Sequence, residues 1–65
     1  MFNLNNFLAM LMKNGYTKEK LANELDISMT SLYRRLNNSG NFTSEEVRIM
    51  ISLFGKEDVF NSLYF

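Results

Sequence analysis

The sequence predicts an all-α protein, a compact bundle of five helices forming a single domain over residues 1–65. Three observations support this fold class. Apolar residues recur at helical spacing, no segment shows the strict alternation of a half-buried strand, and the chain contains no proline. A domain this small needs a dense apolar core to offset its chain entropy. Apolar residues make up 46% of the sequence, including six Phe and five Met, so such a core is available.

The first expected helix, residues 4–13, carries apolar residues along one face. Asn14 and Gly15 follow it, and both residue types tolerate the left-handed conformation that closes a helix. Met10 and Met12 lie off the apolar face, where they either fill gaps in the core, which we favour, or mark a groove for a partner. The face itself consists of Leu4, Phe7, Leu8 and Leu11.

Two short helices are expected next, over residues 18–25 and 29–37. Thr17 and Ser28 each precede one of them and can cap it with a hydroxyl oxygen. Asp26 lies between the helices, and Asp is among the few non-glycine residues that visit the left-handed region at modest cost. The sequence therefore predicts a tight turn between the two helices. A polar loop over residues 37–41 should follow.

The last two helices have clear start and stop signals. Thr43 and Glu46 match a capping box at the start of a fourth helix, which Gly55 ends. Its apolar face is Val47, Met50, Ile51 and Phe54. A fifth helix should run from Lys56 to about Leu63, with Val59, Phe60 and Leu63 facing inward.

Composition argues against an enzyme. The chain has no Cys and no His, which removes the usual zinc sites, the common catalytic triads and most general bases. The paired acidic residues fall in first turns of helices, where the helix dipole and caps explain them. We therefore expect no catalysis, metal, cofactor or small-molecule substrate. No apolar run approaches the about 20 residues of a membrane span, and no leader pattern is visible, so we expect a cytoplasmic protein without membrane contact.

The charge distribution is polarised although the formal net charge is zero. Residues 1–43 hold five basic and three acidic side chains, whereas residues 44–65 hold two basic and four acidic ones. A neutral chain is unfavourable for DNA binding, because Lys and Arg supply the attraction to phosphates. A polarised one can still present a basic side to DNA.

The second and third helices show a restrictive pattern, with a small residue, Ala22, where two helices would touch. Leu21, Leu25, Ile27, Leu32 and Leu36 surround it. Together with Tyr16 to Lys20 and Ser28, these residues resemble the helix-turn-helix of the phage Cro and repressor family. Gly15 to Thr17, Phe42-Thr43 and the apolar C-terminus are similar to small Cro-like regulators of phages of Gram-positive bacteria, so the resemblance covers nearly the whole chain. The alternative is that two helices of an unrelated bundle merely pack in its core.

The resemblance implies a lambda-repressor-like bundle with the helix-turn-helix over Lys18 to Asn37 and a recognition helix from about Met29 to Leu36. Two positions depart from the family pattern. Asp26 stands where the family usually has Gly, at some cost in stability. Lys18 stands where the family usually has Gln, which replaces a bidentate amide with a flexible charge near phosphate.

In this family the recognition helix lies in the major groove, with its N-terminal side chains on base edges. By resemblance, the base-contacting residues are Met29, Thr30, Tyr33 and Arg34. Arg34 can donate a bidentate pair to guanine, and Thr30 can bond a base or touch a thymine methyl group. Arg35 lies between the core face and the groove face. The expected phosphate contacts are Lys18, Ser28, Asn37, Asn38 and Asn41.

One module of this size makes few base contacts, so we expect a homodimer, at least on double-stranded operator DNA. The apolar C-terminus either pairs with a second copy or completes the core; its residues are Phe60, Leu63, Tyr64 and Phe65. Two functions remain in view. The first is a transcriptional regulator that represses by occupying an operator. The second, which the zero net charge favours, is a protein-interaction module, an antirepressor or inhibitor, on the same fold without DNA binding.

Overall fold

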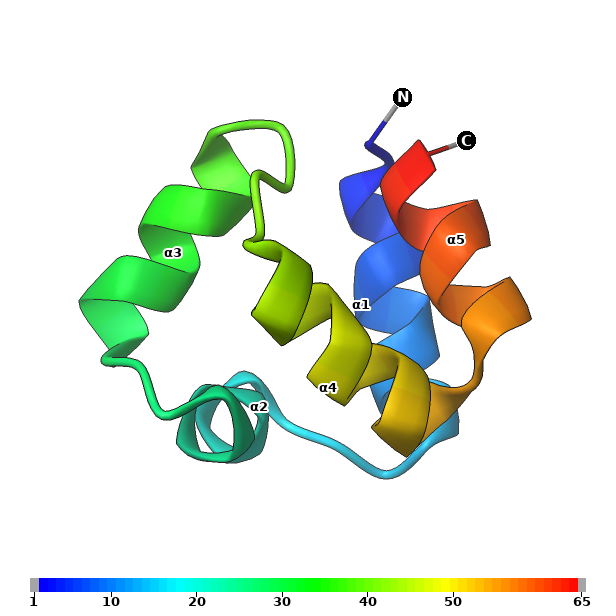
Figure 1. Ribbon diagram of the computed structural model, residues 1–65, viewed down its shortest axis with the longest axis horizontal. Helices are drawn as coiled ribbons and strands as arrows, with labels where there is room; N and C mark the ends of the chain where they lie inside the picture. The colour runs from blue at the N-terminus through cyan, green and yellow to red at the C-terminus, as the bar shows by residue number, and fades with distance from the viewer. Residues whose placement is uncertain (1, 65) are drawn as a thin grey trace.

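The computed structural model describes residues 2–64, and these form five helices and no strand (Figure 1). In chain order the helices are α1 (Leu4–Lys13), α2 (Lys18–Leu25), α3 (Met29–Asn37), α4 (Ser44–Phe54) and α5 (Lys56–Tyr64). The predicted all-α class is confirmed, and the expected helix ends agree closely with the observed ones. No helix within residues 2–64 is both long and apolar enough to cross a membrane.

Local capping explains where the helices begin. The hydroxyl oxygens of Thr17 and Ser28 each accept a backbone N–H from three residues further on, at 3.1 Å in both cases. At the start of α4, Thr43 and Glu46 form the complete capping box. Asp26 ends α2 in the left-handed conformation, with φ 58° and ψ 45°, as its residue type allows. These four caps were all predicted.

The helices surround one core, to which each contributes a fully buried side chain. These side chains are Phe7, Leu21, Leu32, Met50 and Val59, from α1 to α5 respectively. The ring of Phe42, just before α4, stacks on Phe7 with a centroid distance of 5.6 Å. In Figure 1, α3 and α5 lie at opposite sides of the molecule with α4 between them. The core therefore ties together segments that are distant in sequence.

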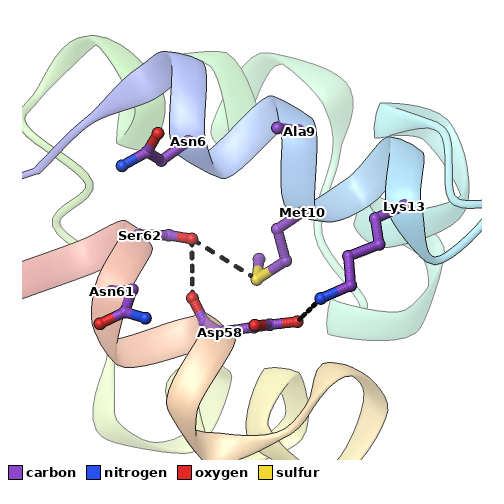
Figure 2. A pocket seen from close by; sticks show the side chains of 7 residues that line it. All are labelled: Asn6, Ala9, Met10, Lys13, Asp58, Asn61 and Ser62. Carbon is purple, nitrogen blue, oxygen red and sulfur yellow. Dashed lines mark hydrogen bonds and ion pairs between the residues drawn. The ribbon is translucent and has the colours of Figure 1, made fainter.

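The N-terminal and C-terminal helices lie side by side (Figure 1). The Asn3 N–H donates to the Ser62 carbonyl at 3.1 Å. Further along, Lys13 Nζ lies 3.1 Å from the Asp58 carboxylate across a groove of about 280 Å³, shown in Figure 2. The Ser62 hydroxyl inside this groove donates to the Asp58 carbonyl and contacts the Met10 sulfur. These polar groups are thus engaged with one another, joining α1 to α5.

Burial differs from the expectations for α1 at two positions, Leu4 and Met12. Leu4 was expected to face inward but is 42% exposed, because it lies in the first turn near the chain end. Met10 is buried and fills the core, as favoured. Met12 was expected to do the same, but it is 80% exposed, so that expectation was wrong. On α4, Met50 and Phe54 are buried while Val47 and Ile51 are half-buried.

Candidate nucleic-acid interface

The candidate interface is built on α2 and α3, which are joined by residues 26–28. Ala22 in α2 is buried, and its carbonyl accepts the N–H of Ile27 at 3.0 Å. This hydrogen bond holds the backbone just after α2, and so constrains the path of the chain toward α3. Leu32 and Leu36 anchor the inner face of α3 in the core. The opposite face of α3 is left on the surface.

The outer face of α3 carries three of the four predicted base-contacting residues in exposed positions. Thr30 and Arg34 are exposed, and Tyr33 is 46% exposed. Met29 differs from these three because its side chain is half-buried and packs against the core cluster. Part of its side chain is therefore committed to folding. The side chains exposed to a partner are therefore Thr30, Tyr33 and Arg34, and the exposed part of Met29 adds apolar surface.

Lys18 connects the start of α2 to this face. Its ammonium lies over the Tyr33 ring, 5.2 Å from the centroid. A cation held over an aromatic face is attracted by the ring quadrupole, so the contact favours one placement of both side chains. Lys18 is half-buried in this position. The predicted phosphate contact and one predicted base contact are thus neighbours in space.

The remaining predicted phosphate contacts are all exposed, but their polar groups differ in availability. The Ser28 hydroxyl is already used in capping, since it accepts from the Ser31 N–H and donates to the Ser31 hydroxyl. Asn37 lies at the end of α3. Asn38 and Asn41 line a shallow depression of about 300 Å³ beside that end, together with Arg34, Arg35 and Thr43. The structure thus brings Asn38 and Asn41 together with Arg34.

An ion pair between α3 and α4 was not predicted from the sequence. Arg35 Nε donates to Glu46 Oε1 at 2.7 Å, and Arg35 Nη1 donates to the Ser31 carbonyl at 3.2 Å. The same Glu46 oxygen accepts the Thr43 N–H of the capping box at 3.0 Å. Sequence reasoning assigned Glu46 only to that box. The pairing depends on how α3 and α4 are placed, which no local pattern reveals.

The environment of Glu46 keeps its carboxylate charged. Burial of the side chain raises the pKa of Glu46, but the hydrogen bonds from Arg35 and Thr43, together with the charge of Arg35, outweigh that effect. The net result is a pKa below the usual value for Glu. Glu46 therefore remains an anion at neutral pH, and Arg35 has a permanent counter-charge beside it.

The C-terminal residues divide between the core and the surface. Leu63 is only 6% exposed and belongs to the core. Of the two roles that the sequence left open, pairing with a second copy or completing the core, Leu63 therefore has the second. Phe60 is half-buried, and Tyr64 is 55% exposed with its ring edge-on to Phe60 at 5.4 Å. Phe65 lies outside the described residues. Of the described residues among these four, Phe60 and Tyr64 therefore keep exposed surface at this end, whereas Leu63 does not.

Comparisons of the chain with models of protein families, with curated proteins and with solved structures find no match. The geometry of the chain itself is therefore the basis for a functional proposal. Among residues 2–64, no group of His, Cys, Asp and Glu side chains is arranged to hold a metal ion.

Proposed function

We propose that this chain is a sequence-specific DNA-binding regulator of the Cro and repressor type, which acts by binding without catalysis in the cytoplasm of a bacterial cell. The observation that carries the proposal is the joint exposure of Thr30, Tyr33 and Arg34 on a helix anchored from beneath by Leu32 and Leu36. A helix fits the major groove of B-DNA, where each base pair presents a distinct pattern of donors and acceptors. In this proposal α3 is the recognition helix and occupancy of an operator represses transcription.

The chemistry of the exposed side chains suits base readout. Arg34 has a guanidinium that can donate two parallel bonds to guanine, and among residues 2–64 it has no carboxylate partner. Thr30 offers a hydroxyl and a methyl group to a base edge. Lys18 and the amides of Asn38 and Asn41 border this face, where phosphates would pass if α3 entered the groove.

We propose that the active form on DNA is a homodimer, since a single α3 touches too few bases for operator specificity. The exposed side of the C-terminal helix, with Phe60 and Tyr64, offers apolar area for a second copy. Two-fold symmetry would place two recognition helices about one DNA turn apart. The preferred site would then be an inverted repeat with half-sites about 10 base pairs apart, centre to centre.

Selection of binding sites from random double-stranded DNA tests the function directly. We expect enrichment of an inverted repeat by the full chain at moderate salt. Recovery of no preferred sequence by folded protein would contradict the regulator proposal. That outcome would favour the second candidate, an antirepressor or inhibitor that uses the same face for protein binding, which the zero net charge of the chain favours.

Arg34→Ala and Lys18→Ala form a matched pair that separates base readout from phosphate contact. Arg34→Ala should cost roughly 1–3 kcal/mol on the selected site while random DNA is little affected. Lys18→Ala should weaken binding to all DNA and reduce the slope of log K against log salt by about one. Fluorescence anisotropy on both DNAs at several salt concentrations measures both quantities. Equal losses on selected and random DNA for Arg34→Ala would refute base readout by this residue.

A further inference from the structure

Arg34 and Arg35 are neighbours in sequence but differ in their surroundings. Arg34 is exposed, whereas the Arg35 side chain is only 24% exposed and is paired with Glu46. Both residues line the depression beside the C-terminal end of α3. A guanidinium at this place would ordinarily be assigned to a phosphate. The buried carboxylate of Glu46 cancels most of its attraction for one, since the two charged groups are 2.7 Å apart.

Arg35 is also the residue through which α3 holds the loop that follows it. Its carbonyl accepts the Gly40 N–H at 3.0 Å, while its side chain reaches Glu46 in α4. Glu46 in turn accepts the Thr43 N–H at the end of the same loop. Residues 38–43 are therefore fastened at both ends by one connected set of bonds, which runs from α3 through Arg35 and Glu46 to the start of α4.

The position of α3 makes this attachment important. In Figure 1, α3 lies at the edge of the molecule, on the far side of α4 from α5. Its buried apolar anchors are Leu32 and Leu36, which fix its depth in the core, and Met29 is half-buried against the same core. Apolar contacts are non-directional, so they hold the helix in place without strongly fixing its rotation or tilt. A short charged hydrogen bond at one end supplies the missing direction.

We propose that the Arg35–Glu46 ion pair is a positioning element, which sets the orientation of α3 and of residues 38–43 and withholds Arg35 from the DNA. This inference rests on the proposed DNA-binding function. Arg35 then acts through the geometry of its neighbours rather than by touching a base or a phosphate. Two adjacent arginines of the recognition helix would have separate tasks, with Arg34 contacting DNA and Arg35 orienting the helix.

Glu46→Gln tests the proposal because the two possible roles of Arg35 predict opposite changes in affinity for the selected DNA site. Gln keeps an oxygen for the Thr43 N–H and removes the charge that holds Arg35. If the pair positions α3, affinity for the selected site should fall about 5- to 10-fold, the difference between a charged and a neutral hydrogen bond, with random DNA unchanged. If Arg35 is instead a phosphate contact restrained by Glu46, freeing it should raise affinity for both DNAs, which would overturn the proposal.

Glu45→Gln is the matched control. Glu45 is the preceding residue in the first turn of α4 and is exposed. Within residues 2–64, Arg35 forms its ion pair with Glu46 and not with Glu45. Its replacement removes the same charge without touching the pair, so it should leave the specificity ratio unchanged. Arg35→Gln should lower the ratio of selected-site to random-DNA affinity by a similar factor, and the double variant should lower this ratio no further than either single variant. Additive losses in the double variant would contradict action through a shared bond.

Hydrogen exchange on the free protein separates this inference from the proposed function. In Glu46→Gln, backbone amides near the end of α3 and in residues 38–43 should exchange at least several-fold faster than in the wild-type chain, while those of α1 and α5 keep their rates. A uniform change across all helices would indicate a merely general loss of stability and overturn the inference. If the wild-type protein selects no DNA, the proposed function fails, and the exchange pattern alone decides whether the pair positions α3.

Discussion

Replacing Leu32 with alanine is expected to lower the free energy of unfolding by about 2–5 kcal/mol. Leu32 is fully buried on the inner face of α3, and its truncation both loses the transfer free energy of the removed carbons and leaves a cavity. A domain of this size has a total stability of only about 3–10 kcal/mol, so the variant should be partly unfolded at 37 °C. Urea denaturation followed by circular dichroism measures the loss, which should appear in the midpoint with little change in slope.

Thr30→Ala is the control for this experiment, since Thr30 lies on the same helix but on the exposed face. Alanine has the higher helix propensity and no buried contact is lost, so stability should stay within about 0.5 kcal/mol of the wild type. A Leu32→Ala variant as stable as Thr30→Ala would mean that α3 is not anchored by its inner face. The exposed face of α3 would then lack the rigid support on which the proposed readout depends.

The helices could be predicted because their ends are local events. Thr17, Ser28 and Thr43 cap helices with atoms only three residues away, and Asp26 closes a turn through its own backbone preference. Such interactions are visible in a short window of sequence. Buried and exposed faces follow nearly as well, because a helix that packs against a core must repeat its apolar residues at helical spacing.

The predictions were incomplete where the exposure or the partner of a side chain depends on how the helices are placed relative to one another. Leu4 continues the apolar face of α1 in sequence but lies beyond the region that other helices cover, so it remains 42% exposed. Arg35 was placed between two faces, and only the position of α4 shows that Glu46 meets it. A signal was present nonetheless: an arginine at the border of a core face requires a partner when it is covered. Which acidic residue supplies it cannot be read from spacing.

Gly40→Ala is expected to have the second large effect, a loss of about 2–4 kcal/mol in stability. Gly40 has φ +67°, a conformation that costs an alanine roughly 1–2 kcal/mol. A Cβ at this position would also lie 2.3 Å from Cδ1 and 2.8 Å from Cγ of the Phe2 ring. The ring would have to leave its place beside Phe7, where the centroids are 5.8 Å apart. Thermal unfolding should show a melting temperature lower by about 10 °C or more.

Gly15→Ala separates the two parts of that cost. Gly15 has φ +71°, but a Cβ there would meet nothing within 4 Å, so its substitution carries the backbone penalty alone. Gly40→Ala should therefore be the more damaging by the value of the Phe2 packing. Adding Phe2→Ala should remove this excess, since no ring is left to displace. The double variant should therefore be less stable than Phe2→Ala by about the backbone penalty alone. If Gly40→Ala lowers stability no more than Gly15→Ala, the Phe2 ring does not stabilise the loop over residues 38–43. That end of the proposed DNA-binding surface would then be held by Arg35 and Glu46 without help from the N-terminal segment.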